Sequence, residues 1–149
     1  DLRAYAAGAL TVDLTTADPT TLEAHLQATG LPFPSRVFDF GMMRYRLTGG
    51  GLHRVARQPS ALFAYEGADE SPDQGSRRLR LLCQMYEGTI SGLPAPTERR
   101  TNDGVAFLVY REGDVTVVFW QEGRVVCVLA ANGDAEAAIK LAFAKAVRI

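Results

Sequence analysis

The sequence predicts an α+β domain: a mainly antiparallel sheet of about six strands, flanked by an N-terminal and a C-terminal helix. Three observations lead to this class. Short apolar runs recur along the middle of the chain, and glycine-containing turns separate the last three of them. One helical pattern precedes these runs, and a second helical pattern follows them. The chain has 149 residues, enough for one domain, so we assign residues 1–149 to a single unit.

The stretch ADPTTLEAHLQATG predicts the first helix. Asp18 is a favourable N-cap, and Pro19 suits the first helical position because its missing N–H needs no partner there. Leu22 and Leu26 lie four residues apart and therefore share one face of the helix. Gly30 is a typical C-terminal stop. We expect a short helix with an apolar stripe.

Strand patterns follow a proline-containing extended segment, LPFPSRVFDFG. We expect separate strands at MRYRL, LHRVA, SALFAYEG and RRLRLLCQMYEG. The glycines between the first two runs, Gly49–Gly51, predict a turn or a bulge, because glycine adopts the backbone conformations needed there. In the fourth run, alternation places Leu81, Cys83 and Met85 on one face. The polar stretch ADESPDQGS is expected to form a turn or mobile loop.

The segment Gly88–Gly104 is the longest expected loop, and loops of that length are often functional or mobile. Three strands then follow in close order, VAFLVYREG, DVTVVFWQEG and RVVCVLAANG, as in an antiparallel meander. Both faces of the second strand are largely apolar, so we expect cover on both faces of the sheet. The last segment predicts a helix that begins after Asp134 and places an alanine-rich face on the sheet.

Composition and charge argue against two kinds of function. The net charge is −1, so a nucleic-acid partner, which needs a basic surplus, is not expected. No stretch approaches about 18 apolar residues, so we expect no membrane span within this sequence. The chain starts with Asp1 rather than Met, so we expect a piece of a longer protein, in which an anchor or targeting segment could precede it.

The glycine run beside His53 raises the question of phosphate binding. A phosphate loop needs a strand, a glycine loop and then a helix whose N-terminus faces the anion. Here Pro59 follows too soon for a helix, and no Lys-Ser or Lys-Thr pair comes after the glycines. We therefore expect no nucleotide and no other cofactor at this position.

Histidine and cysteine are too scattered along the chain to predict a metal site. Structural zinc ligands normally come in close pairs, whereas His25, His53, Cys83 and Cys127 stand singly. We expect no metal, a surface position for His25, and buried positions for the two cysteines in apolar strands. A disulfide between Cys83 and Cys127 stays an open alternative that depends on whether their strands are neighbours.

No catalytic residues stand out in the sequence. The sequence has no Gly-x-Ser-x-Gly elbow. A dyad of His53 with a cysteine is supported only by the presence of these residue types. Glu66 and Glu87 could form a carboxylate pair, but each closes a strand in a Tyr-Glu-Gly triplet, which is more typical of a turn. Four aromatic residues could line an apolar pocket, although core packing is the commoner role of such side chains. These are Tyr86, Phe107, Tyr110 and Trp120.

A fixed order of turns and apolar positions runs through roughly residues 11–146. Its parts are the LPF segment Leu31–Phe33, the glycine-rich strand Gly41–Gly50, Tyr65, the pair Phe119–Trp120 with Gly123, and the helix from Asp134 onward. This order resembles the extracytoplasmic part of membrane-anchored anti-sigma factors. That family is similar in its leading helix, its strand-turn with paired glycines, its aromatic-Trp strand before a glycine turn and its closing helix.

The resemblance implies a non-catalytic sensing or regulatory domain on the periplasmic side of the inner membrane. It implies control of an extracytoplasmic-function sigma factor through a cytoplasmic domain, whose His-x3-Cys-x2-Cys zinc motif this sequence lacks. The membrane span would also lie outside this chain, with residues 1–17 as a juxtamembrane segment or linker. A protease or a periplasmic signalling protein would be a further partner. No catalytic, cofactor or metal residues carry over from the family.

Other functions stay open beside this one. A small-ligand-binding module would use a pocket between sheet and helix, with Gly88–Gly104 as a lid. A hydrolase-type enzyme would combine His53 with Cys83 or Cys127, which we expect less. A homodimer through free strand edges is also open, because a meander leaves edges that must be capped or paired.

Overall fold

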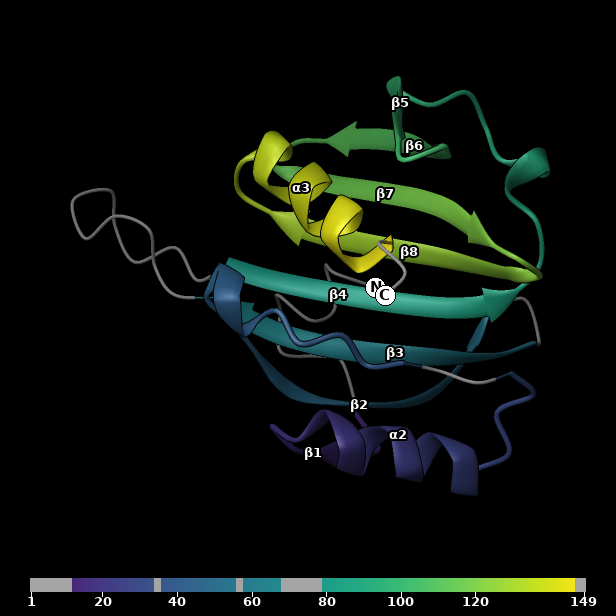
Figure 1. Ribbon diagram of the computed structural model, residues 1–149, viewed down its shortest axis with the longest axis vertical. Helices are drawn as coiled ribbons and strands as arrows, with labels where there is room; N and C mark the ends of the chain where they lie inside the picture. The colour runs from purple at the N-terminus through teal and green to yellow at the C-terminus, as the bar shows by residue number, and fades with distance from the viewer. Residues whose placement is uncertain (1–11, 34–35, 56–57, 68–78, 147–149) are drawn as a thin grey trace.

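The protein folds around one antiparallel sheet (Figure 1). The computed structural model describes residues 12–33, 36–55, 58–67 and 79–146. Within them, eight strands lie in the order β1-β2-β3-β4-β8-β7-β6-β5, with two α-helices. The predicted α+β class is confirmed, with eight strands rather than about six. The elements are β1 (Leu14–Thr15), α2 (Pro19–Ala28), the 3-10 turn η1 (Gly41–Met43), β2 (Tyr45–Val55), β3 (Gln58–Gly67), β4 (Leu79–Glu87), the 3-10 turn η3 (Ile90–Gly92), β5 (Glu98–Asn102), β6 (Val105–Glu112), β7 (Val115–Glu122), β8 (Val125–Asn132) and α3 (Ala135–Ala146).

Helix α2 forms where the sequence predicts it. The Asp18 carboxylate accepts a hydrogen bond from the Thr20 N–H at 3.1 Å, and Pro19 occupies the first helical position. Leu22 and Leu26 are fully buried, as their spacing predicts. The helix packs against β2 at one end of the sheet (Figure 1).

The glycine run lies inside one continuous strand, β2. The expected turn at Gly49–Gly51 is therefore wrong, and so is the division of MRYRL and LHRVA into two strands. The expected bulge is present, because the pairing of β2 with β3 shifts register between Leu47 and Gly49. A Cβ on Gly50 would overlap the carbonyl oxygen of Leu62 and lie 2.9 Å from Leu22 Cδ2. The glycines thus allow the chain on both sides of β2 to approach closely.

The ends of β2 add two differences from the prediction. Met43 belongs to η1 rather than to a strand, and both Met42 and Met43 expose their side chains. Leu14 and Thr15, within the expected linker 1–17, form β1 and pair with β2. That part of the segment therefore belongs to the sheet. Residues 1–11 and the expected loop ADESPDQGS lie outside the described residues.

The predicted meander is confirmed in β6, β7 and β8, which pair in sequence order. The two turns contain Gly113 and Gly123, with φ of +62° and +59°, a backbone region that favours glycine. Helix α3 begins after Asp134 as predicted and lies over β7 and β8 (Figure 1). The predicted alanine-rich face is present: Ala135, Ile139 and Ala142 are buried, and Phe143 and Ala146 are partly buried.

The expected loop Gly88–Gly104 contains the edge strand β5, which the sequence analysis missed. Strand β5 pairs with β6. Arg100 of β5 forms ion pairs with Glu98, at 3.1 Å, and with Glu136 of α3, at 2.5 Å. The hydrogen bonds with Glu136 and Glu98 raise the pKa of Arg100. This contact joins the edge of the sheet to the start of the last helix.

Both helices pack on the same face of the sheet. The larger buried cluster combines Leu22 and Leu26 of α2 with Ile139 and Ala142 of α3 and with alternate residues of the strands. The opposite face holds a smaller buried cluster, formed by Leu62, Ala64, Leu82 and Ala130. We expected cover on both faces, and the described helices lie on one of them. None of the helices in the described ranges is long and apolar enough to cross a membrane.

Candidate functional site

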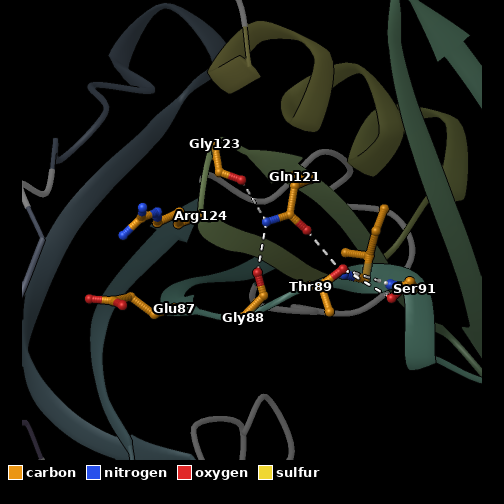
Figure 2. A pocket seen from close by; sticks show the side chains of 8 residues that line it. Glu87, Gly88, Thr89, Ser91, Gln121, Gly123 and Arg124 are labelled. Atoms are coloured by element: carbon orange, nitrogen blue, oxygen red, sulfur yellow. Dashed lines mark hydrogen bonds between the residues drawn. The ribbon is translucent and has the colours of Figure 1, made fainter.

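A surface pocket of about 560 Å³ lies where the connection after β4 meets the turn between β7 and β8 (Figure 2). It is lined by Glu87, Gly88, Thr89, Ile90, Ser91, Gln121, Gly123 and Arg124. The pocket therefore adjoins the start of the segment Gly88–Gly104, which the sequence indicates as functional. We expected a ligand pocket between the sheet and a helix, with Gly88–Gly104 as its lid. This pocket lies elsewhere, because side chains such as Trp120 and Phe107 fill the space between the sheet and α3.

The Gln121 side chain holds the two walls of this pocket together. Its Nε2 donates hydrogen bonds to the Gly88 and Gly123 carbonyl oxygens, at 2.8 and 3.0 Å. Its Oε1 accepts one from the Ile90 N–H at 3.0 Å. The Gly88 N–H also donates to the Arg124 carbonyl oxygen at 2.9 Å. The loop after β4 is thus fixed to the β7–β8 turn by side-chain and backbone bonds.

Two rims of the pocket carry different chemistry. On one rim, Thr89 Oγ1 accepts a hydrogen bond from the Ser91 N–H at 3.2 Å and donates one to Ser91 Oγ at 3.1 Å. On the other, the Glu87 and Arg124 side chains both point away from Gln121 (Figure 2). The pocket therefore offers hydroxyl groups, one carboxylate and one guanidinium.

The sheet separates His53 from both cysteines. His53 pairs with Ser60, and Ser60 pairs with Tyr86, which places these side chains on one face. Cys83 and Cys127 occupy the other face, beneath the helices. Since successive side chains of a strand point to opposite faces, the dyad considered for an enzyme is not assembled. The Ser60 hydroxyl instead donates to the His53 carbonyl oxygen at 2.9 Å.

The remaining candidates are also apart from one another. Glu66 pairs with Arg80 at one end of β4, and Glu87 closes its other end, about 23 Å away at the usual rise per strand residue. Glu66 lies 3.4 Å from Arg46 in an ion pair. His25 is half-buried, with its Nε2 3.8 Å from Asp13 Oδ2. No carboxylate pair forms from Glu66 and Glu87.

The four aromatic residues lie on both faces of the sheet and so line no common pocket. Trp120 and Phe107 are buried under α3, with ring centroids 5.6 Å apart. Tyr110 and Tyr86 lie on the opposite face, where the Tyr110 hydroxyl donates to the Pro94 carbonyl oxygen at 2.7 Å. Core packing accounts for Trp120 and Phe107, as their strand positions favour.

Cys83 and Cys127 are buried free thiols on neighbouring strands. Cys83 pairs with Leu129, and Cys127 pairs with Met85, so the two cysteines are diagonal neighbours. Diagonal positions are about 7–8 Å apart, which exceeds the usual reach of a disulfide. The register therefore explains why the disulfide left open by the sequence is not formed in this structure.

We expect the stability of the protein to fall above pH 9 because both buried thiols, Cys83 and Cys127, have a raised pKa. Burial raises the pKa of Cys83 to about 11 from 9.0, against an opposing effect of the nearby Lys145. Between these values the unfolded state loses a proton that the native state keeps, so the free energy of unfolding decreases by about 2 kcal/mol. Urea unfolding at pH 8 and pH 11 measures this change. Cys83→Ala should show a smaller pH dependence, and an equal dependence would contradict the assignment.

Lys145 is a largely buried residue on the sheet side of α3. Its side chain is only 5% exposed, and its Nζ lies 5.5 Å from the centre of the Phe63 ring. Among the described residues, none forms an ion pair or a hydrogen bond with this ammonium group. The Nζ atom itself is not fully buried, but a charge held against an apolar surface without an anionic partner still loses part of its hydration.

We therefore expect Lys145→Met to stabilise the protein. Methionine has similar length and no charge to desolvate, so the free energy of unfolding should rise by up to about 1 kcal/mol. Lys140→Met, at an exposed position of the same helix, is the matched control and should change stability by less than about 0.5 kcal/mol. Urea unfolding followed by Trp120 fluorescence gives both values. A clear loss of stability in Lys145→Met would show that the ammonium group has a stabilising role.

Comparison of the chain with family models, curated proteins and solved structures gave no match. The function is therefore argued from the residues and contacts described above. Sequence reasoning indicated the segment that begins at Gly88, but it missed Gln121 and Arg124. Their only sequence signal is their place at the glycine turn between two predicted strands.

Proposed function

We propose that this chain is the non-catalytic extracytoplasmic sensing or regulatory domain of a membrane-anchored anti-sigma factor. In the full-length protein it lies on the periplasmic side of the inner membrane. Its state controls an extracytoplasmic-function sigma factor, which a cytoplasmic domain outside this chain binds. A protease or a periplasmic signalling protein is the partner that responds to this state.

The observation that carries the proposal is that the residues of the resemblance are packing residues of one fold. Leu31 and Phe33 belong to the main buried cluster. The Tyr65 hydroxyl donates a hydrogen bond to the Phe38 carbonyl oxygen at 2.7 Å. This bond joins Phe38, which follows the LPF segment in the chain, to β3. Trp120 is fully buried beneath α3. A motif order built from such positions is typical of a shared fold rather than of a shared catalytic site.

The position of His53 also supports a non-catalytic role over the hydrolase alternative. That alternative needs the imidazole within hydrogen-bond reach of a thiol, about 3.2 Å or one water further. The sheet itself lies between His53 and the two cysteines. The small-ligand alternative, by contrast, is favoured by the pocket at Gly88–Ser91, and a sensing domain can contain such a pocket.

Purification of the full-length gene product tests the proposal. We expect it to contain a membrane span and a cytoplasmic segment upstream of Asp1, and to co-purify with a sigma factor from detergent extracts. A matched version without the cytoplasmic segment should lose the sigma factor while residues 12–146 stay folded. A full-length protein that begins at or near Asp1, or that binds no sigma factor, would contradict the proposal.

A further inference from the structure

Among the described residues, the large apolar side chains that are exposed to solvent are those of Met42 and Met43. Both belong to the turn η1, where Met42 is fully exposed and Met43 is 39% exposed. Met85, the third methionine of the chain, is 8% exposed and lies in the main buried cluster. Core packing therefore accounts for Met85 but not for the pair in η1.

The backbone of η1 is fixed by hydrogen bonds that do not involve these two side chains. The Met43 N–H donates to the Phe40 carbonyl oxygen at 2.9 Å, and the Arg44 N–H donates to the Gly41 carbonyl oxygen at 3.1 Å. The Tyr45 N–H also donates to the Phe40 carbonyl oxygen, at 3.2 Å, and the Phe40 ring is buried. A chemical change at either sulfur atom therefore leaves the turn and the core in place.

The side chains that usually react first with oxidants are protected by the fold. Oxidants attack the thiolate form of cysteine, and burial raises the pKa of Cys83 to about 11. Cys127 is also buried, and its Sγ donates a hydrogen bond to Glu122 Oε2 at 2.8 Å, so its proton is held as well. Trp120 is fully buried. A thioether needs no deprotonation, so its reactivity follows its exposure, which is highest in η1.

We propose that Met42 and Met43 form an oxidation site, at which hypochlorous acid converts the thioethers to sulfoxides. Each sulfur loses two electrons and gains an S–O bond. The O–Cl bond of hypochlorous acid breaks, its chlorine leaves as chloride and its proton goes to water. The product replaces an apolar surface with a polar one. A methionine sulfoxide reductase reverses the change, because two thiols become a disulfide while the oxygen leaves as water.

This inference does not depend on the proposed function. Oxidation is a property of the η1 turn alone, and it can be present or absent whether or not a sigma factor is controlled. Failure of the oxidation experiment therefore leaves the sigma-factor experiment unaffected, and the reverse also holds.

The test is treatment of the folded chain with increasing amounts of hypochlorous acid, followed by peptide mass spectrometry, which measures the oxygen added at each methionine. We expect Met42 to be oxidised first, Met43 next, and Met85 at least about tenfold more slowly than Met42. Alkylation after unfolding should still find both cysteines as free thiols, and treatment with a methionine sulfoxide reductase and a dithiol should restore both thioethers. Oxidation of Met85 or of either cysteine as fast as Met42 would overturn the proposal.

Two controls show whether the fold directs the oxidant. In concentrated urea, the three methionines should react at equal rates and the cysteines should compete with them, whereas the native order of rates in urea would contradict a role of exposure. The double variant Met42→Leu with Met43→Leu keeps apolar side chains of similar size and should take up at least about fivefold less oxygen in the folded state. Met85→Leu is the matched control and should take up as much oxygen as the unchanged chain. Undiminished uptake by the double variant would contradict the assigned site.

Discussion

Replacing Trp120 by alanine is expected to lower the free energy of unfolding by about 4 kcal/mol. Trp120 is fully buried between β7 and α3, and its ring lies 5.6 Å from that of Phe107. Its Nε1 donates a hydrogen bond to Glu122 Oε2 at 3.2 Å, and the same oxygen accepts one from Cys127 Sγ at 2.8 Å. The substitution thus leaves a cavity and removes one donor from a half-buried carboxylate.

Urea unfolding followed by far-ultraviolet circular dichroism measures this loss, because the variant has no tryptophan. Phe119→Ala is the matched control, since the neighbouring ring is half-buried on the opposite face and should cost about half as much. Trp120→Phe separates the hydrogen bond from the packing and should cost about 1–2 kcal/mol. A loss below about 1 kcal/mol in Trp120→Ala would show that this residue is not central to the core.

Replacing Gly50 by valine is expected to destabilise the protein by about 3 kcal/mol or more. Its first added carbon would overlap the Leu62 carbonyl oxygen of β3, which is backbone and cannot turn aside. It would also lie 2.9 Å from Leu22 Cδ2, the end of a flexible side chain that would have to turn aside. The overlap with the Leu62 carbonyl therefore accounts for most of the expected loss, since only a shift of β2 away from β3 can relieve it.

Gly92→Ala is the control for this prediction, because an added Cβ there meets no atom within 4 Å. It should change the free energy of unfolding by less than about 1 kcal/mol. Thermal or urea unfolding of both variants gives the comparison. If Gly50→Val were as stable as Gly92→Ala, the close approach of β2 to the Leu62 carbonyl of β3 would be wrong.

The helices and the meander could be predicted because their signals are local. Asp18 and Pro19 specify the start of α2 within a few residues, and glycine turns specify the hairpins of β7. Strand β5 could not be predicted, since ERRTN has no apolar alternation. It lies at the edge of the sheet, where pairing with β6 and the contact of Arg100 with α3 replace burial.

The glycine run shows why the same residues can be misjudged. Three consecutive glycines usually indicate a turn, and the sequence contains no sign that Gly50 faces a helix and a neighbouring strand at once. The need for small residues comes from Leu22 and Leu62, which lie 28 and 12 residues away in sequence. Only the tertiary structure brings these groups together.

The candidate site depends on contacts of the same long-range kind. Gln121 bonds Gly88 across 33 residues, and Lys145 reaches Phe63 from the last helix. The sequence indicated the loop after Gly88, but it could not indicate which side chains hold that loop. The two cysteines were correctly expected to be buried, while their diagonal register depends on the pairing of β4 with β8.

The most direct test of the proposed regulatory role is transcription from promoters that the cognate sigma factor uses. The full-length gene is expressed in cells with Gly50→Val, with Gly92→Ala or unchanged. If this domain controls the sigma factor, the destabilised Gly50→Val protein should raise sigma-dependent transcription, and Gly92→Ala should match the unchanged protein. Equal transcription in all three strains, with Gly50→Val shown to be unfolded, would contradict a regulatory role for this domain.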